Sequence, residues 1–268
     1  MGNLYNIETK FKGESLSSIE IAEQTYETPE VRLLPNLNVL KIGGQSIMDR
    51  GKNAVYPIVD EIRKNRTKHQ LLIGVGGGTR SRHAYSVALD MDMPTGILAT
   101  LGTSVSRQNA RMLYMLLSKD GGIFVPKDAF EQISIFVHAK AIPIICGMPP
   151  YTYWEHPPET GRIPPHRTDV GVFLMAESLG AKSLIFLKDE EGLYTADPKK
   201  DPDAKFIPKI NIQELIDLDL NDLIIERPLL QMLNNAHFIK KLQIINALKP
   251  ENITKALEGE EIGTIIYK

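Results

Sequence analysis

Short runs of apolar residues alternate along the chain with longer segments in which apolar residues recur every three or four positions. The first pattern is typical of buried strands and the second of amphipathic helices. Strands are predicted over residues 39–42, 70–75, 123–125, 141–146 and 183–187. Helices are predicted over residues 50–66, 79–92, 104–119, 129–140 and 168–179. Because strands alternate with helices, we expect a three-layer α/β fold in which helices cover both faces of a mostly parallel central sheet.

The two ends of the chain differ in their pattern. The C-terminal end continues the alternation with a strand, a helix and a strand, at 242–246, 251–257 and 263–267. Residues 1–32 are polar and show neither period, although Ser15 or Ser17 could cap a short helix. We therefore expect one domain over residues 33–268 and an N-terminal arm over residues 1–32, either free or docked on a neighbouring subunit.

Composition narrows the class of protein. The chain has 268 residues, of which 43% are hydrophobic and 24% are charged, enough for a full core. Its net charge of −2 gives no electrostatic reason to expect binding to nucleic acid or to a bilayer. The N-terminus has no apolar signal core, and no run approaches the ~18 apolar residues of a membrane span. The single cysteine, Cys146, excludes an internal disulfide and fits a buried small residue better than a nucleophile. We expect a soluble, cytoplasmic protein.

Two of the predicted strands end in glycines that lie next to basic residues. These residues are Lys41, Gly43 and Gly44 at the first strand, and Gly76, Gly77, Gly78, Arg80 and Arg82 at the second. A cation beside backbone that carries no side chains lets a phosphate approach closely. For either strand end alone, an ordinary turn is the alternative. The pair predicts one phosphate-binding site that is split between two strand ends.

A charged loop follows the strand at 183–187, and the carboxyl end of such a strand is where α/β sheets bind ligands. Residues 187–202 contain Gly192 and two Asp-Pro pairs, which favour successive turns. The side chains that could hold a nucleotide base and metal-bound phosphates are Lys188, Asp189, Glu190 and Tyr194. A solvated turn is the alternative, and charge alone would favour it.

The segment 147–169 contains six prolines, the only tryptophan and two histidines, His156 and His166. This density of proline excludes regular structure, so we expect a long ordered loop, and loops of this length are usually functional. Either histidine could bind a metal or an oxyanion, or could have a structural role at the surface. Asp169, at the end of the segment, either caps the next helix or orients Lys41 or a metal.

Together these motifs resemble the amino-acid kinase family, which includes uridylate, aspartate and acetylglutamate kinases. The likeness extends over residues 34–268 and rests on Lys41-Ile42-Gly43-Gly44, Gly76-Gly77-Gly78, Thr168-Asp169, the run from Asp189 to Pro198, and Glu260-Glu261-Ile262-Gly263-Thr264. The resemblance implies the amino-acid kinase fold and a site for ATP and magnesium. It implies that Lys41 faces the transferred phosphate, that Asp169 orients Lys41 and that Arg82 holds an oxyanion. The other implied nucleotide contacts are Gly43, Gly44, Gly76, Gly77, Gly78, Lys188, Asp189, Glu190, Gly192, Tyr194 and Asp197.

Within this family the chain resembles the molybdenum-storage subunits in particular. Four stretches carry that likeness: residues 41–51, 78–83, 148–151 and 163–169. The resemblance implies a hexameric cage of two related subunit types, which binds ATP with magnesium and packs molybdate or tungstate as polyoxometalate clusters. His156 or His166 would then lie near the metal. One storage subunit type has a histidine-rich stretch in the long loop, whereas residues 151–156 of this chain hold one histidine.

Three functions stay open at this point. The first is ATP-dependent oxometalate storage in a homo- or hetero-hexamer. The second is a kinase for a nucleoside monophosphate, like uridylate kinase, or for a small acid. The third is a nucleotide-binding protein without turnover. The long loop and Asp189 favour the first, because a uridylate kinase usually has a shorter loop and a lysine at these places. We therefore expect a storage subunit with no nucleic-acid or membrane partner.

Overall fold

The computed structural model describes residues 11, 13, 15–26 and 30–268. The chain forms two compact units, Met1–Val31 and Arg32–Lys268. The described part of the first unit contains helix α1 (Ile19–Tyr26), which begins close to the predicted cap at Ser17. The other helices and strands of the described residues belong to the second unit.

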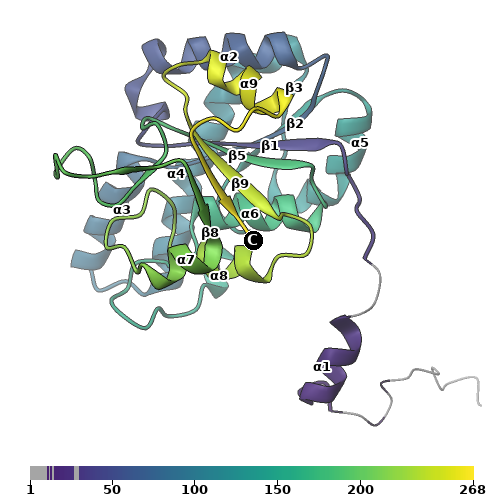
Figure 1. The fold of residues 1–268 in the computed structure, drawn as a ribbon, viewed down its shortest axis with the longest axis vertical. Helices are drawn as coiled ribbons and strands as arrows, with labels where there is room; N and C mark the ends of the chain where they lie inside the picture. Colours follow the sequence, from purple (N-terminus) through teal and green to yellow (C-terminus); the bar gives the residue numbers. More distant parts are fainter. Residues whose placement is uncertain (1–10, 12, 14, 27–29) are drawn as a thin grey trace, which may run out of the picture. The chain divides into compact units, whose positions relative to one another are not determined.

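An eight-stranded sheet forms the centre of the second unit, in the order β3-β4-β2-β1-β5-β9-β10-β8 (Figure 1). Neighbouring strands are parallel except for β9 and β10, which confirms the predicted mostly parallel sheet. A separate two-stranded hairpin joins β6 (Leu193–Tyr194) and β7 (Phe206–Ile207). The strands of the main sheet are β1 (Leu37–Ile42), β2 (Gln70–Val75), β3 (Gly122–Phe124), β4 (Ile142–Cys146), β5 (Ser183–Lys188), β8 (Lys209–Asn211), β9 (Lys241–Asn246) and β10 (Thr264–Tyr267).

Helices cover both faces of the sheet, as the sequence predicts (Figure 1). Helices α2, α4 and α9 pack on one face, and α5, α6, α7 and α8 pack on the other. Val39 and Leu40 of β1 belong to opposite apolar layers, because successive side chains of a strand point to opposite faces. Strands buried on both faces therefore read as continuous apolar runs. The helices are α2 (Lys52–Asn65), α3 (Thr79–Asp90), α4 (Thr95–Leu117), α5 (Ile133–His138), α6 (Thr168–Ser178), α7 (Ile212–Asp217), α8 (Pro228–Asn235) and α9 (Glu251–Glu258).

Helix α4 begins at Thr95, well before the predicted start at residue 104. The residues between these positions include glycine and threonine, whose low helix propensity hides the helix in the sequence. In the structure the hydroxyls of Thr100 and Thr103 donate to carbonyls one turn earlier, and Leu98 is fully buried. Burial of this face therefore outweighs local propensity.

Two further segments differ from the prediction. The helix predicted over 129–140 is a 3₁₀ helix (Lys127–Gln132) followed by α5. Residues 203–240, where the apolar pattern predicts no element, hold β7, β8, α7 and α8. In the described part of the chain, none of the helices combines the length and the apolar character that crossing a bilayer requires.

Candidate functional site

A cavity of about 1280 Å³ opens at the carboxyl ends of β1, β2 and β5. This edge is where α/β sheets usually bind ligands. Its wall includes the loops after these strands, the side of α3 from Thr79 to Leu89, the start of α6 and residues 222–226. Arg80, which the sequence analysis placed at the phosphate site, lies outside the lining and bonds to Gln108 and Asn109 instead. The other residues that the sequence analysis assigned to catalysis or nucleotide binding all line this one cavity: Lys41, Gly43, Gly44, Gly76, Gly77, Gly78, Arg82, Asp169, Lys188, Asp189, Glu190, Gly192, Tyr194 and Asp197.

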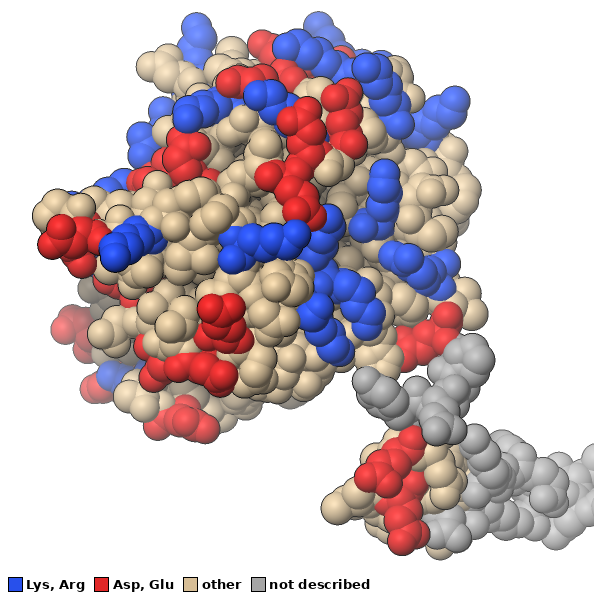
Figure 2. Space-filling view, in the orientation of Figure 1, with Lys and Arg blue, Asp and Glu red and all other residues tan. Residues whose placement is uncertain are grey.

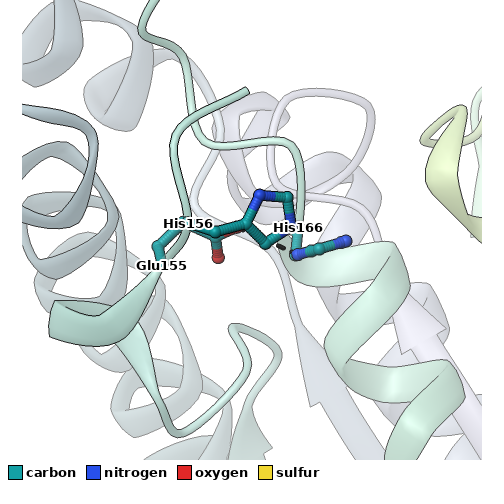
Figure 3. Close-up of side chains that lie close together, drawn as sticks. All are labelled: Glu155, His156 and His166. Carbon is teal, nitrogen blue, oxygen red and sulfur yellow. Dashed lines mark hydrogen bonds and ion pairs between the residues drawn. The ribbon is translucent and has the colours of Figure 1, made fainter. Parts of the chain in front are cut away.

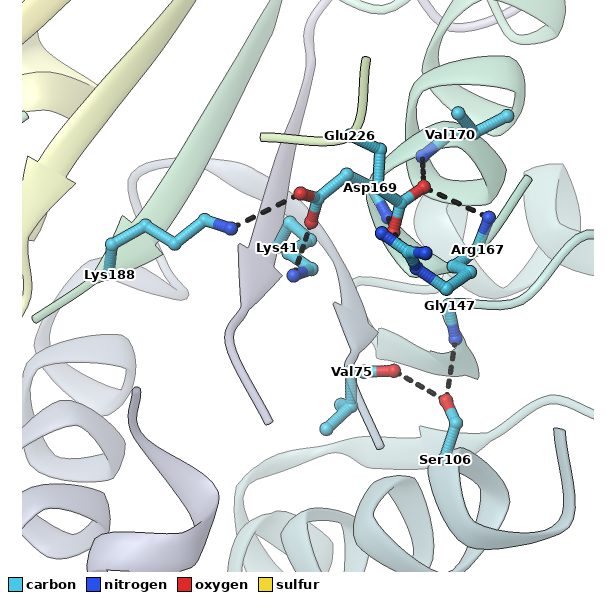
Figure 4. Close-up of polar contacts among 9 residues, drawn as sticks. All are labelled: Lys41, Val75, Ser106, Gly147, Arg167, Asp169, Val170, Lys188 and Glu226. Carbon is cyan, nitrogen blue, oxygen red and sulfur yellow. Dashed lines mark hydrogen bonds and ion pairs between the residues drawn. The ribbon is translucent and has the colours of Figure 1, made fainter. Parts of the chain in front are cut away.

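A buried carboxylate between two buried lysines is part of the cavity wall. Asp169, in the first turn of α6, pairs through Oδ1 with Lys41 near the end of β1. Its Oδ2 lies 3.2 Å from Nζ of Lys188, the last residue of β5, and accepts a hydrogen bond from it. All three residues are less than a tenth exposed. Figure 4 shows the two lysine side chains converging on this carboxylate from different strands. The predicted orientation of Lys41 by Asp169 has its geometric basis in this contact.

The cluster holds two cations for one anion, and the pKa values reflect this imbalance. Burial acts to raise the pKa of Asp169, but the charges of Lys188 and Lys41 hold it well below its usual range. Burial lowers the pKa of Lys188 to about 8 against the opposing charge of Asp169, and the charge of Lys41 adds to the lowering. A bound anion would supply the missing negative charge and favour protonated Lys188.

Glu226, which the sequence analysis does not single out, holds the start of α6. Its buried carboxylate accepts hydrogen bonds from the backbone N–H groups of Arg167, Asp169 and Val170, at 2.9, 3.0 and 3.1 Å (Figure 4). No helical carbonyl can satisfy N–H groups at a helix start, so an external carboxylate stabilises them. The alternative that Asp169 caps this helix is therefore wrong: the N-cap is Arg167, and its side chain makes no capping bond. Burial and the charge of Asp169 raise the pKa of Glu226.

The glycine segments after β1 and β2 touch each other through their backbones. A Cβ atom at Gly44 would lie 2.1 Å from Gly78 N, and one at Gly76 would lie 2.7 Å from Gly44 N. Because both neighbours are backbone atoms, neither position can take a side chain without a shift of the chain. Gly78 also has a φ of +77°, which side chains disfavour. The two strand ends therefore form one continuous backbone surface.

The acidic loop after β5 is tied to the loop after β1. Asp189 Oδ2 accepts hydrogen bonds from Arg50 over 2.6 Å and from Lys199 over 3.0 Å, and Lys199 also pairs with Glu190 over 2.8 Å. Burial acts to raise the pKa of Asp189, but the hydrogen bonds from Arg50 and Lys199 hold it below its usual value. This loop is consequently part of the cavity wall rather than a freely solvated turn.

His156 and His166 lie outside the cavity lining, in a second polar cluster with Glu155 (Figure 3). His166 Nδ1 lies 2.9 Å from Glu155 Oε1, and the two imidazole centroids are 4.8 Å apart. One possible ligand atom from each of the three residues lies within 4.8 Å of the others. Glu155 is buried and His156 is exposed. The sequence analysis misses Glu155. Its contact with His166 depends on how the proline-rich loop folds back on itself.

Charge on the face of the molecule seen in Figure 2 is mixed. Acidic and basic side chains of the second unit lie side by side across this face, consistent with a net charge of −2.

The profile of the amino acid kinase family matches residues 36–237, and the chain belongs to this family. Over 252 residues it is 47% identical to the molybdenum storage protein subunit beta of Azotobacter vinelandii, covering 94% of this chain and 93% of that one. Over 242 residues it is 30% identical to a uridylate kinase of Methanocella arvoryzae, covering 85% of this chain and 98% of the kinase. The crystal structure of the uridylate kinase from Archaeoglobus fulgidus has the same fold, with a TM-score of 0.69 at 24% identity over 86% of this chain and 99% of that one. The predicted family and fold are confirmed.

Proposed function

We propose that this chain is an ATP-binding subunit of an oligomeric cage that stores molybdenum or tungsten as polyoxometalate, with ATP hydrolysis during loading. One observation carries the proposal. The chain gathers the predicted lysines, glycines and carboxylates into a single cavity, and it does so in a sequence 47% identical to a molybdenum storage subunit.

The residues of the cavity fit a magnesium-bound nucleotide. Lys41, Lys188 and Arg82 supply positive charge for phosphates. Asp189 and Glu190 supply carboxylate oxygens, the ligands that magnesium prefers. Both charge types therefore stand in one cavity, as a complex of a polyanion and a divalent cation requires.

One polar atom of the wall supports the same fit. The hydroxyl of Ser81, in the first turn of α3, is buried and has no hydrogen-bond partner among the described residues. An unsatisfied buried hydroxyl costs about 1–3 kcal/mol. A phosphate oxygen that accepted this hydrogen bond would offset the cost.

Within this proposal ATP supplies the phosphoryl group that is transferred to water. Lys41 neutralises charge on that group, and Asp169 holds Lys41 and Lys188 in place by their ion pairs. Phosphoryl transfer depends on positioning and electrostatic stabilisation more than on covalent help. The buried lysines and the uncovered glycine backbone supply these two effects.

A uridylate kinase-like activity is the second candidate. The chain that forms this cavity is also 30% identical to a uridylate kinase. A coupled assay with UMP and magnesium-ATP separates the two. Formation of UDP at rates above the hydrolysis of ATP would favour the kinase. ATP binding without phosphate release would favour the third candidate, a nucleotide-binding protein without turnover.

The same proposal includes an oligomer in which the long proline-rich loop contacts a neighbouring subunit. Trp154 is 79% exposed and Tyr153 is 64% exposed, so the loop offers apolar area to a neighbouring subunit. We assign the contact with oxometalate to His156 and His166, since a neutral imidazole nitrogen binds metal centres. Part of the predicted arm 1–32 lies outside the described residues, and its docking on a neighbouring subunit stays a prediction.

Elemental analysis of the protein purified from cells grown with molybdate tests the proposal. We expect molybdenum in large excess over the number of subunits, and retention of the metal through gel filtration of the oligomer. Metal-free protein from such cells, together with UDP formation in the coupled assay, would replace storage by the kinase reaction.

A double substitution, His156→Ala with His166→Ala, tests the role of the loop. We expect an intact oligomer with less metal per subunit after loading with ATP and molybdate. His138→Ala, which removes an exposed histidine of α5, is the matched control and should load normally. An assembled double variant with full metal content would show that the loop only seals a subunit contact.

A further inference from the structure

Asn109 lies in the middle of α4 and is fully buried, although asparagine is a poor residue for a helix interior. Its side-chain amide is completely used. Nδ2 donates to the carbonyl of Gly76 over 2.7 Å and to the carbonyl of Gly77 over 3.0 Å, and Oδ1 accepts from the guanidinium of Arg80. The orientation of this amide is fixed, because carbonyls only accept and a guanidinium only donates. Both hydrogens of Nδ2 must therefore face the glycine segment.

Fixing these two carbonyls also fixes two N–H groups. In a trans peptide the C=O and the following N–H point in opposite directions. The carbonyl of Gly76 shares its peptide with the N–H of Gly77, and the carbonyl of Gly77 shares its peptide with the N–H of Gly78. Both N–H groups must then point away from α4. Within residues 30–268, neither N–H donates a hydrogen bond to a protein group.

Asn109 lies outside the cavity lining, whereas Gly77 and Gly78 both line it, so we take the side of the segment away from Asn109 as the cavity side. The backbone of Gly44 packs against Gly78. A Cβ at Gly44 would sit 2.1 Å from Gly78 N, so only glycine at this position lets the segment 76–78 keep its place in the cavity wall.

A second residue of α4 anchors the neighbouring strand ends. Ser106, one turn before Asn109, donates through Oγ to the carbonyl of Val75 over 2.6 Å and accepts from the N–H of Gly147 over 3.2 Å (Figure 4). It ties the ends of β2 and β4 to the same helix face. The helix therefore holds the glycine segment against a rigid support, as pre-organised donors require.

We propose that Asn109 is a positioning residue, which turns the N–H groups of Gly77 and Gly78 into the cavity as a donor pair for one tetrahedral oxoanion. The anion is either a phosphoryl group of the nucleotide or a free oxometalate, which share this chemistry. The proposal rests on the proposed function only in taking the cavity as the place where such an anion binds. Asn109 itself stands behind the glycine segment and acts through it.

Asn109→Ala tests the proposal by isothermal titration with magnesium-ATP, with molybdate alone and with inorganic phosphate alone. We expect the affinity for the anion held by the glycine segment to fall about 10- to 100-fold, the usual effect of losing a charge-assisted hydrogen bond. Gln108→Ala is the control, because Gln108 is exposed and accepts a hydrogen bond from the other side of the Arg80 guanidinium. If only the affinity for magnesium-ATP falls, the N–H donor pair binds a phosphoryl group of the nucleotide. If only the affinity for molybdate falls, the donor pair binds the oxometalate.

Glycine-selective ¹⁵N labelling separates positioning from a general structural role. In the wild type we expect the amide protons of Gly77 and Gly78 to move downfield as the anion is added, while Gly74 in β2 stays in place. In the folded Asn109→Ala variant these movements should be lost. If that variant keeps wild-type affinity and wild-type amide shifts while only its melting temperature falls, Asn109 is merely structural and the proposal is overturned.

Two outcomes keep the test decisive. If Asn109→Ala does not fold, Asn109→Asp takes its place, since an ionised carboxylate fills the same space and can still accept from Arg80 but cannot donate to the two carbonyls. Unchanged affinity and unchanged amide shifts in Asn109→Asp would then overturn the proposal. If the wild type responds to inorganic phosphate but to neither ATP nor molybdate, the donor pair stands and the proposed function fails. No response to any of the three anions removes the donor pair.

Discussion

Replacing Lys188 by methionine keeps most of the volume of a buried side chain and removes its charge. Lys188 is 8% exposed and shares Asp169 with Lys41. We expect Lys188→Met to stabilise the protein at pH 7 and to weaken the binding of ATP. The two effects have one cause, because the uncompensated positive charge that destabilises the empty site is the charge that attracts an anion.

The magnitude follows from the pKa of Lys188, which burial lowers from 10.5 to about 8. At about 1.4 kcal/mol for each pKa unit, this difference corresponds to about 3 kcal/mol against the charged form in the folded protein. Between pH 8 and 10.5 the unfolded chain binds more protons at this lysine than the folded protein does, so the free energy of unfolding rises with pH in this window. Lys188→Met lacks this rise. Its advantage should approach about 3 kcal/mol below pH 8 and vanish above pH 10.5.

Urea unfolding at pH 7 and at pH 10, at one protein concentration, measures the difference. Lys199→Met is the matched control. Lys199 is mostly exposed, and its hydrogen bond with Glu190 raises its pKa, so removing its charge should not stabilise the protein. The affinity of wild-type protein for ATP should fall as pH rises through about 8, where Lys188 loses its proton, and the profile of Lys188→Met should be flatter.

The reasoning would be refuted by either of two results. One is a Lys188→Met variant that is less stable than wild type at pH 7. The other is a gain in stability of the same size at pH 7 and pH 10. The first result would mean that the pairing of Lys188 with Asp169 outweighs the burial of its charge. The second would mean that the gain does not come from the charge.

Three other measurements test the site and the assembly. Lys41→Ala should stay folded, because Asp169 keeps Lys188 as a partner, and should lose ATP affinity or phosphate release; unchanged values of both would show that the cavity is not the nucleotide site. Gly44→Ala should lower the free energy of unfolding by about 1–3 kcal/mol, because its Cβ would lie 2.1 Å from Gly78 N, and an unchanged melting temperature would contradict the backbone contact. Light scattering should report an oligomer, most simply a hexamer, and a monomer at micromolar concentration would remove the proposed cage.

Much of the site could be predicted from sequence because parallel strands align their carboxyl ends at one edge of the sheet. Lys41, the glycines at 76–78 and Lys188 each follow or end a recognisable apolar run, so their meeting needed no knowledge of side-chain contacts. The pairing of Asp169 with Lys41 was one of two alternatives. The structure decided between them, because the N-cap is Arg167 and the N–H groups at the helix start donate to Glu226.

Two of the residues that the sequence analysis missed have partners far away in the chain. Glu226 acts on the start of α6, and Asn109 acts on the end of β2. A glutamate after an apolar run and an asparagine inside a helical pattern carry no local signal for these contacts. The early start of α4 was missed for a similar reason, since burial of Leu98 against α3 overrides the low helix propensity of its neighbours.

The sequence by itself determined the layers of the second unit and the edge of the sheet at which its chemistry collects. Hydrophobic periodicity and glycine placement act locally, and each can be read from a few consecutive residues. Only the tertiary structure decided how charge and hydrogen bonds are shared within the site. Two lysines compete for one aspartate, and one buried amide turns two peptide groups, because packing brings together groups that the chain holds apart.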